Sequence, residues 1–437
     1  MTVEDSDAPL CDALMGVLGS GAHDVPGIVN GLNKANVPPP GAHRWTEELF
    51  LEQLRQRAQT PEKKPSPAIV RADYDAADEP GLRRPGDGAP TPRNVEERTE
   101  YLLRQGIRNQ WYCIAASSQV SDKPLGIQRL GERLVLWRDK EGKVRALEDR
   151  CPHRGVALSV GEVQEGVLAC AYHGVQVDGS GRVVRVPALA DCPLEGRKLV
   201  RAYPVIEHYH AIWAYFGDEK HPAPAPLELP AELVSPEWSG MLHFDTWEAH
   251  YRYIHDNLCD PMHGPYLHAK SYTLSGGSRT DQVAVQKTEQ GFANVRVSQK
   301  RGNIDLLEFV DNASTYYTRV EVPLPPTAGP GDIMRIIFYV TPIEDNRSQI
   351  HGWRLRKVSG WQRDLWHFLF KVRLRNFTNA VLEQDKRALS AMPPWPPAEN
   401  LYQHDLGVVR VRKHLRDAAH SQAREFFRDA RAEVVRN

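Results

Sequence analysis

The sequence contains no long hydrophobic run. No stretch of its 437 residues approaches the roughly 20 apolar residues that a membrane-spanning helix requires. Charge of one sign is not in excess either, since the formal net charge is -1, which gives no general attraction to nucleic acid or to an anionic membrane. The first residues, MTVEDSDAP, are acidic, unlike the basic and then apolar start of a secretory signal. We therefore expect a cytoplasmic protein with no membrane and no nucleic acid among its partners.

Cysteine is also scarce. The six cysteines are scattered, apart from two near the middle of the chain, so they do not form the framework of a disulfide-stabilised protein. A glycine-rich nucleotide-binding motif is missing as well, because Gly19-Ser20-Gly21 is followed by neither a third glycine nor a strand-to-helix context. Any electrons from a nicotinamide cofactor would therefore come through a separate protein.

The two neighbouring cysteines lie in the stretch CPHRGVALSVGEVQEGVLACAYHG (residues 151–174). It contains two Cys–His pairs, Cys151 with His153 and Cys170 with His173, separated by sixteen residues. Zinc fingers usually keep cysteines together and histidines together, whereas each pair here mixes one thiolate with one imidazole. That mixture is typical of a Rieske [2Fe-2S] cluster, in which two histidines replace two cysteines on one iron. We predict that one iron binds the two cysteines and the other binds the two histidines.

The residues beside these pairs distinguish two Rieske classes. The respiratory class has a disulfide between its loops, with one cysteine soon after the first histidine and another inside the second pair. Here those positions hold Arg154, Gly155 and Val156 in the first loop and Ala171 and Tyr172 in the second. The missing bridge argues against the respiratory class, and CPHRG and CAYHG resemble the Rieske domain of non-haem iron oxygenases.

The first part of the chain, residues 1–58, is expected to be a helical extension. We predict a short helix at 8–20 and a second at 45–58, which has Thr46 as its N-cap. The stretch from 28 to 56 resembles the small helical segment of site-specific recombinases. We interpret it as a docking or oligomer-contact element rather than as a DNA contact.

A linker and a β-rich domain are expected next. Residues 59–95 are dense in proline, glycine and charge, which favours a mobile or surface-draped linker. Residues 96–222 then contain short β-runs, and a Rieske domain is predicted there. Each Cys–His pair lies next to a predicted hairpin, the first formed by 134–139 with 144–149 and the second by 175–178 with 182–187.

The remaining residues, 223–437, predict an α+β domain. Four strand-like runs at even spacing between 293 and 358 favour an antiparallel sheet. A long helical segment follows from Trp361 to about Leu389, and an amphipathic one closes the chain at 409–434. Five aromatic residues of the sheet could line a substrate pocket, but we expect each to fill the core: Phe292, Phe309, Tyr316, Tyr317 and Phe338.

A second candidate metal site lies in HDNLCDPMHGPYLH (residues 255–268). His263 and His268 are five residues apart, which separates them by about 140° around a regular helix. Pro261 and Pro265 interrupt such a helix, because proline removes a backbone hydrogen bond and clashes with the preceding turn. We therefore predict a broken helix in which the two imidazoles converge.

Two imidazoles and one carboxylate on one face of an iron, with open positions beside them, form the site of Fe(II) oxygenases. The carboxylate is expected in NAVLEQDKRAL (residues 379–389), on the long helix after the sheet. Glu383 and Asp385 are both candidates, and spacing alone does not choose between them.

Together, the two motifs resemble those of the catalytic α subunits of Rieske non-haem iron oxygenases, also called ring-hydroxylating oxygenases, over residues 108 to 420. The second motif reads N-x-x-D-x-x-H-x-x-x-x-H, from Asn257 through Asp260 to the two histidines. By this resemblance, the third iron ligand is Asp385. NLCDPMHGPYLH and DLGVVRVRKHL (405–415) are most similar to the branch that contains phthalate and vanillate oxygenases, which are usually trimers of α subunits.

The resemblance also implies a catalytic role for Asp260. In the family, the matching aspartate lies between a cluster histidine of one subunit and an iron histidine of its neighbour, where it can orient both imidazoles. A homotrimer, or a multiple of trimers, is therefore expected. The implied fold is a Rieske β-domain beside a helix-grip-like catalytic domain, which is an antiparallel sheet with helices.

The function implied by the resemblance is that of the oxygenase component of a multicomponent system. Electrons from NAD(P)H would pass through a separate flavin or iron–sulfur reductase, with or without a ferredoxin, to the [2Fe-2S] cluster and a mononuclear Fe(II). With O2, a small organic substrate, aromatic or similar, would be hydroxylated, demethylated or cis-dihydroxylated. The alternatives are a Rieske-type electron-transfer protein without oxygenase activity and a zinc-bearing, DNA-associated protein.

Overall fold

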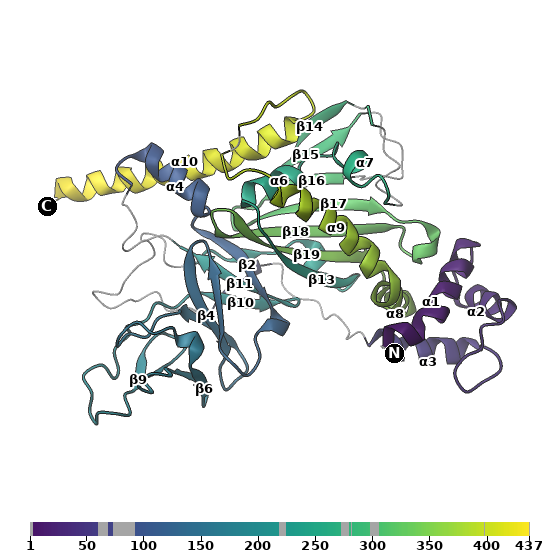
Figure 1. Cartoon of the computed structure of the whole chain (residues 1–437), viewed down its shortest axis with the longest axis horizontal. Helices are drawn as coiled ribbons and strands as arrows, with labels where there is room; N and C mark the ends of the chain where they lie inside the picture. The colour runs from purple at the N-terminus through teal and green to yellow at the C-terminus, as the bar shows by residue number, and fades with distance from the viewer. Residues whose placement is uncertain are drawn as a thin grey trace.

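The structure is a computed structural model of the whole chain, and it describes residues 3–59, 69–72, 92–217, 224–271, 279–280, 282–297, 306–396 and 398–436. Most of the linker predicted at 59–95, and the boundary predicted near residue 222, lie outside these ranges. Figure 1 shows a helical N-terminal part at one end, a β-rich part at the other, and a large sheet with its helices between them.

The N-terminal part consists of three helices, α1 (Val3–Gly19), α2 (Val25–Lys34) and α3 (Glu47–Ala58). The predicted cap of α3 is confirmed, since the Thr46 side chain accepts a hydrogen bond from the backbone amide of Leu49. Helix α1 begins earlier than expected, and α2 was not expected. Two glycines lower the helix propensity of α2, but Gly31 allows α1 to approach closely, because a Cβ there would lie 2.5 Å from Val17.

These helices pack on the helix that precedes the predicted carboxylate. Leu14, Leu18 and Phe50 share one buried apolar cluster with Leu365 and Phe368 of α8 (Gly360–Leu369). The segment expected as one long helix, from Trp361 to about Leu389, is α8, a π-helical turn (Phe370–Leu374) and α9 (Arg375–Ser390). The N-terminal part therefore rests on the same continuous helical rod that carries the two candidate carboxylates.

The β-rich part contains three small antiparallel sheets. Both predicted hairpins are confirmed, since β4 pairs with β5 and β8 pairs with β9. The first sheet contains β3 (Leu125–Arg129), β4 (Glu132–Arg138) and β5 (Val144–Glu148); the second β2 (Gln110–Ala116), β10 (Val205–His208) and β11 (Ala211–Phe216); the third β6 (Glu162–Gln164), β7 (Val167–Ala169), β8 (Gln176–Val177) and β9 (Val183–Arg185).

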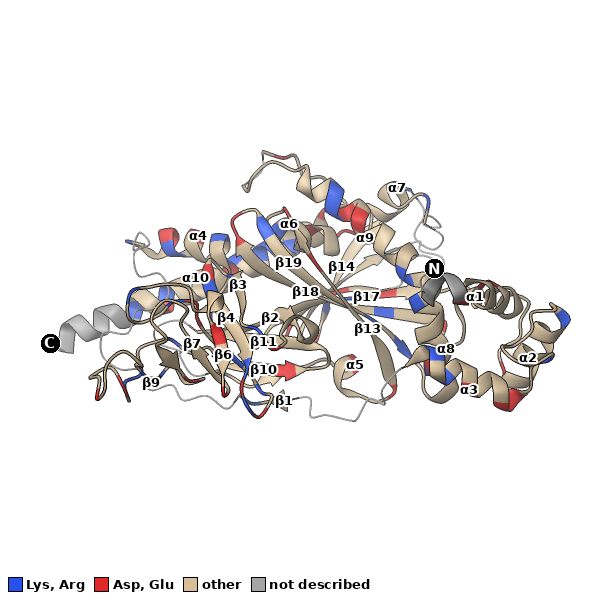
Figure 2. Cartoon of the chain, turned by 60° about the horizontal axis from the view of Figure 1, so that its bottom comes forward, with Lys and Arg blue, Asp and Glu red and all other residues tan. Residues whose placement is uncertain are grey.

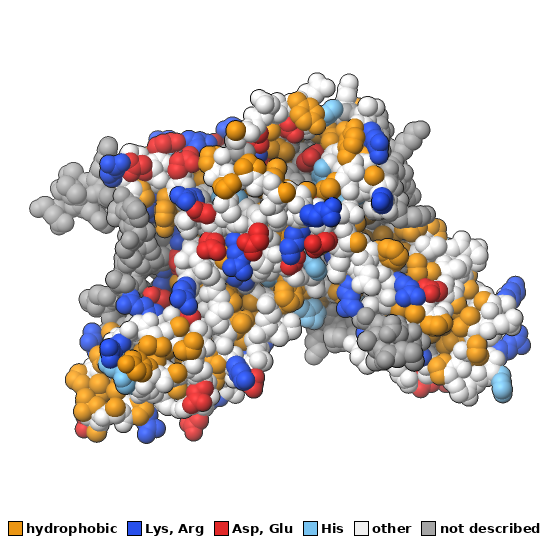
Figure 3. All heavy atoms as spheres, in the orientation of Figure 1, with side chains coloured by type: hydrophobic (Ala, Val, Ile, Leu, Met, Phe, Trp, Pro, Cys, Tyr) orange, Lys and Arg blue, Asp and Glu red, His pale blue; other side chains and the backbone are white. Residues whose placement is uncertain are grey.

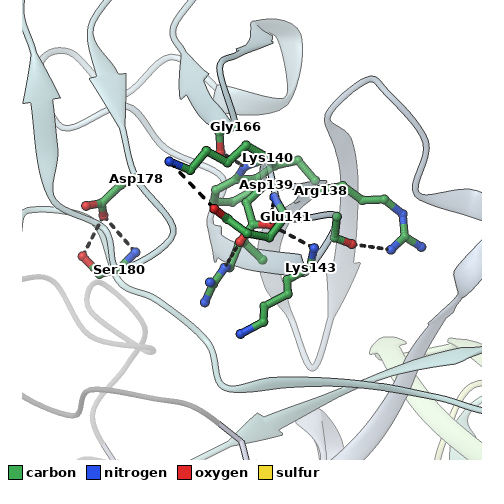
Figure 4. A network of polar contacts seen from close by, with 11 residues as sticks. Arg138, Asp139, Lys140, Glu141, Lys143, Gly166, Asp178 and Ser180 are labelled. Atoms are coloured by element: carbon green, nitrogen blue, oxygen red, sulfur yellow. Dashed lines mark hydrogen bonds and ion pairs between the residues drawn. The ribbon is translucent and has the colours of Figure 1, made fainter.

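The turns of both hairpins are fixed in the same way (Figure 4). In the first, the Asp139 carboxylate accepts hydrogen bonds from the backbone amides of Glu141 and Lys143, at 3.1 and 2.9 Å. In the second, the Asp178 carboxylate accepts from the amide and the hydroxyl of Ser180, at 2.9 and 2.6 Å. Aspartate favours such turns because its short side chain reaches the backbone two residues on.

The large sheet has seven antiparallel strands in the order β13-β19-β18-β17-β16-β15-β14. The expected sheet is confirmed, but only four of its strands were predicted, and β13, β14 and β16 were missed. The strands are β13 (Trp238–Trp247), β14 (Val283–Thr288), β15 (Gly291–Arg296), β16 (Leu306–Asp311), β17 (Tyr316–Pro323), β18 (Ile333–Glu344) and β19 (Arg347–Lys357).

One face of the large sheet packs against helices and the other packs against the β-rich part. The helices on the first face are α6 (Tyr251–Leu258), α9 and α10 (Leu406–Arg436), and their apolar residues share a cluster with Phe292, Phe309 and Phe338. On the other face, Tyr317 shares a cluster with Trp111 and Trp213 of β2 and β11. This α+β arrangement confirms the expected fold class, and those four aromatic residues fill the core as predicted.

Smaller elements complete the described part of the chain. Helix α4 (Val95–Gln105) packs beside α10 at one end of the molecule (Figure 1). The remaining elements are α5 (Ala231–Val234), α7 (Gly264–Leu267), and the short pair β1 (Ile69–Val70) with β12 (Leu227–Glu228). Acidic and basic residues are interspersed over the ribbon in Figure 2, and their numbers nearly balance, with a net charge of -1. In the described ranges, none of the helices combines the length and apolar character needed to cross a bilayer.

Candidate metal centres

The two Cys–His loops have the same backbone design. The first follows β5 and the second follows β7, and in each the amide four residues after the cysteine donates to the carbonyl of that cysteine, from Gly155 to Cys151 and from Gly174 to Cys170, both at 2.9 Å. Both glycines have a positive φ, 80° and 69°, which glycine adopts at no steric cost. The glycine that ends each sequence motif is therefore required by the turn itself.

The loops bring all four predicted cluster residues together. Cys151 and Cys170 are each only 3% exposed, whereas His153 and His173 are exposed and their ring centroids lie 4.7 Å apart. Burial raises the pKa of Cys151 to about 11, so a thiolate there requires a compensating cation. Two buried, interacting thiols and two adjacent imidazoles on these loops are a donor set that suits an iron–sulfur cluster.

Exposed apolar side chains accompany the two imidazoles in the β-rich part. Tyr172, Val160, Val184 and Leu189 are between 41% and 64% exposed, although large apolar side chains are usually buried. Figure 3 shows hydrophobic side chains gathered with a histidine over this end of the β-rich part. The cluster site is thus open to a partner at its histidine side and enclosed at its cysteine side.

The second site is built at a break between two helices, as the prolines predicted. Helix α6 ends at Leu258, and His263 and His268 lie directly before and after the single turn of α7. This break allows residues five apart in sequence to converge, and their ring centroids lie 5.1 Å apart. His268 is 1% exposed. The pair therefore faces inward, unlike the pair in the Cys–His loops.

Asp385 on α9 completes this set. Its Oδ1 lies 3.5 Å from His263 Nε2 and 3.2 Å from His268 Nε2, and it accepts a hydrogen bond from Asn257 at 3.2 Å. One ligand atom from each of the two histidines and Asp385 lies within 4.8 Å of the others, close enough to hold one metal ion. Asp385 is 5% exposed, whereas Glu383 is exposed, so the two candidate carboxylates point to different surroundings.

Hydrogen bonds at Nδ1 fix the orientation of both imidazoles. His263 Nδ1 lies 2.7 Å from the backbone carbonyl of Asp260, and His268 Nδ1 lies 2.9 Å from the side-chain oxygen of Gln384. A proton on each Nδ1 leaves both Nε2 lone pairs directed at the Asp385 oxygen, where only positive charge makes the arrangement favourable. Gln384 was not predicted, because its position beside Asp385 carries no recognisable pattern. The set thus fits a divalent metal such as iron.

The Asp260 carboxylate contacts the backbone of the turn on one side and approaches His263 on the other. One of its oxygens accepts a hydrogen bond from the Met262 amide at 2.7 Å, and the other lies 3.7 Å from His263 Nδ1. Burial lowers the pKa of His263, but the hydrogen bonds to Asp260 and the charge of Asp385 outweigh burial and raise it overall. Within one chain, Asp260 therefore both caps a turn and attracts positive charge to the imidazole.

Comparison with known proteins identifies the two large parts. A family model described as the Rieske [2Fe-2S] domain matches residues 110–204, and the vanillate O-demethylase oxygenase C-terminal domain matches residues 247–421. Both large parts of the chain therefore resemble those of Rieske oxygenases. The Rieske match supports a [2Fe-2S] cluster, and the pairing of the two domains confirms the resemblance to the vanillate-oxygenase branch. A recombinase-like helix-turn-helix domain matches residues 4–59, in the region where a resemblance to recombinases was noted.

Relatives of this chain include the vanillate O-demethylase oxygenase subunit of Pseudomonas sp. (strain HR199), which is 35% identical over 42% of this chain and 50% of the relative. The oxygenase component of dicamba O-demethylase of Stenotrophomonas maltophilia is 30% identical over 48% of this chain and 61% of the relative. The matched region thus spans about half of these relatives.

Solved structures share the fold. Dicamba monooxygenase bound to dicamba has a TM-score of 0.56 and 23% identity and covers 72% of this chain and 98% of its own. The terminal oxygenase of carbazole 1,9a-dioxygenase from Nocardioides aromaticivorans IC177 has a TM-score of 0.60 and 20% identity and covers 75% of this chain and 97% of its own. These likenesses confirm the expected two-part fold.

Proposed function

We propose that this protein is the oxygenase component of a multicomponent Rieske non-haem iron oxygenase. The observation that carries the proposal is the convergence of His263, His268 and Asp385 in a chain that also contains the Cys–His loops. A Rieske electron carrier has no use for a second, buried donor set on a seven-stranded domain. The family matches on both parts support the same function.

In this proposal, Cys151 and Cys170 hold one iron of the cluster, and His153 and His173 hold the other. Bound there, the cluster supplies single electrons. The exposed histidines then form the side through which electrons enter or leave, because the cysteines are covered by protein. The apolar surface beside them suits transient contact with a reductase, with or without a ferredoxin.

His263, His268 and Asp385 are the proposed ligands of a mononuclear Fe(II), which when bound supplies the site of O2 activation. Gln384 and Asp260 hold the imidazoles in the tautomer that presents Nε2 to the metal. Burial of His268 and Asp385 keeps bulk water away from the reacting atoms.

We further propose that the active form is a homotrimer or a multiple of trimers. The Cys–His loops, beside β6 and β9, and helix α7 lie on different sides of the large sheet (Figures 1 and 2). Electron transfer within one chain would have to pass the large sheet, whereas a neighbouring subunit can bring its loops next to Asp260. This carboxylate would then accept a hydrogen bond from a cluster histidine of that neighbour, while it lies 3.7 Å from Nδ1 of His263 in its own chain.

The proposed reaction is the O2-dependent hydroxylation, demethylation or cis-dihydroxylation of a small aromatic or similar compound in the cytoplasm. Electrons come from NAD(P)H through a separate reductase. The named relatives, which demethylate vanillate and dicamba, support methoxylated aromatic acids as the first substrates to screen. The test combines the purified protein with a surrogate reductase and compares NADH consumption with product mass. Reduction of the cluster without substrate-dependent O2 consumption or product would favour the electron-carrier alternative.

A further inference from the structure

A large groove lies apart from both metal centres. It has a volume of about 1210 Å³ and is bordered by α4, by the turn between β3 and β4, and by the segment around Trp395. None of His263, His268 and Asp385 lines it. Its floor includes His250 and Arg252, which are only 2% and 8% exposed.

Most of the charge in this groove is neutralised locally. The ion pairs among the lining residues are Arg93 with Glu97, Arg104 with Asp345, and Arg108 with Glu132. Glu96 and Glu100 are both paired with Arg416. Any charge available to a ligand must therefore come from the remaining charged lining residue, Arg252.

Arg252 has no anionic partner within the described part of the chain. Its guanidinium lies 3.9 Å from the ring of Trp395, but its Nε is buried without a hydrogen-bond acceptor. Asp256, one helical turn along, gives its carboxylate to Arg412 at 2.6 Å instead. Asp256 and Glu100 act on Arg252 only from beyond ion-pair distance. A buried guanidinium without a paired anion is unfavourable, and an aromatic face compensates it only in part.

His250, beside Arg252, provides a second buried hydrogen-bond donor without an acceptor. The Arg252 backbone amide donates to His250 Nδ1 at 3.2 Å, so Nδ1 is the acceptor and Nε2 carries the proton. Nε2 is buried and has no hydrogen-bond partner. Stacking on Trp395, with ring centroids 5.4 Å apart, holds the imidazole in this orientation.

The helix that begins here favours the same kind of ligand. Helix α6 starts at Tyr251, directly after His250, and its first turn contains no acidic residue. The positive end of the helix dipole is therefore not compensated by its own sequence. Guanidinium, imidazole N–H and helix terminus all attract an acceptor with negative charge, and a planar carboxylate matches the forked geometry of arginine.

We propose that this groove binds an organic carboxylate, which pairs with Arg252 and accepts a hydrogen bond from His250 Nε2. The site is separate from the proposed iron ligands, so the proposal does not rest on the oxygenase function. The volume of the groove accommodates a ring as well as the carboxylate.

Benzoate is the probe, with benzamide as its uncharged counterpart at matched ionic strength. Calorimetric titration of the full-length protein should show saturable binding of benzoate and none of benzamide. Arg252→Met should weaken benzoate binding by about tenfold or more, since an ionic hydrogen-bonded pair is lost. Without benzoate, this variant should melt no lower than the wild type, because it removes an uncompensated buried charge. A lower melting temperature together with unchanged benzoate affinity would show that Arg252 is only structural.

Three further variants keep the test decisive. His250→Asn retains an acceptor for the start of α6 but lacks Nε2, so it should weaken benzoate binding severalfold without loss of the fold. Arg104→Gln changes an ion-paired, 67% exposed guanidinium of the same groove and should bind benzoate like the wild type. Asp385→Ala should also retain binding. Absence of saturable binding in the wild type, or its loss in Asp385→Ala alone, would overturn the proposal.

Discussion

The Cys–His loops and the set of His263, His268 and Asp385 differ in how they are built and in how exposed they are. The loops are two copies of one local turn, and all four of their donor residues lie within residues 151–174. The other set joins residues far apart in sequence, since 116 residues separate His268 from Gln384, the neighbour of Asp385. The first site exposes its imidazoles, and the second encloses His268 and Asp385. This difference fits the roles proposed above, because an electron-exchange site must meet a partner and a site for oxygen chemistry must keep water out.

The largest effect on activity is expected from replacing Asp385, the one carboxylate of the histidine site. Asp385→Ala should abolish product formation and the binding of mononuclear iron, because it removes the carboxylate ligand that lies beside both imidazoles. The Rieske spectrum should remain, since the Cys–His loops are elsewhere. Glu383→Ala, which changes an exposed carboxylate on the same helix, is the matched control and should retain the metal. Iron loss in Glu383→Ala but not in Asp385→Ala would show that the wrong carboxylate was chosen.

A complete loss of the cluster is expected when a cysteine of the Cys–His loops is replaced. The purified protein should be red-brown with about two cluster irons per chain. Cys151→Ser should bleach that colour, because a buried hydroxyl does not replace a thiolate ligand. Metal analysis with a visible spectrum provides the measurement, and Cys113→Ser, a buried cysteine outside the loops, provides the control. Full colour in Cys151→Ser would contradict the cluster assignment, and a colourless wild-type protein would favour zinc.

The difference between the two sites explains what sequence reasoning could predict. The loops depend on local chemistry, so the spacing of the mixed Cys–His pairs and the hairpin signals beside them were sufficient. The choice of Asp385 over Glu383 depends on which face of α9 meets α6 and α7, and only the resemblance supplied it before the fold was known. Gln384, His250 and Arg252 had no signal, because their contacts come from packing between distant segments. Strands such as β16 were missed for the same reason, since their burial is set by both neighbouring layers.

The next prediction tests how strongly the enclosed site depends on its supports. Gln384→Leu keeps the approximate size but removes the acceptor that orients His268. Loss of such a partner typically lowers metal affinity by about 10- to 100-fold, so the variant should require more added Fe(II) to saturate. Competition with a chelator measures this directly. Gln362→Leu, on the partly buried side of α8, serves as the control for a glutamine replaced on the same helical rod. Unchanged iron affinity in Gln384→Leu would mean that packing alone holds His268.

The smallest of the expected effects concerns Asp260, where the two sites are proposed to meet across subunits. Asp260→Asn keeps the size and the acceptor for the Met262 amide, so the turn should survive, but it removes the negative charge beside His263. The variant should fold, bind both metals and show a normal cluster spectrum. Reoxidation of the reduced protein by O2 with substrate should slow by roughly tenfold, the lower end of the effect expected for such a partner. Stopped-flow absorbance measures that rate. If Asp260 only caps the turn, the asparagine will reoxidise at the wild-type rate, because asparagine caps as well as aspartate. An Asp260→Asn variant that reoxidises slowly but still binds iron normally would therefore show that Asp260 acts in electron transfer between the two metal sites and not only in the local structure of the turn.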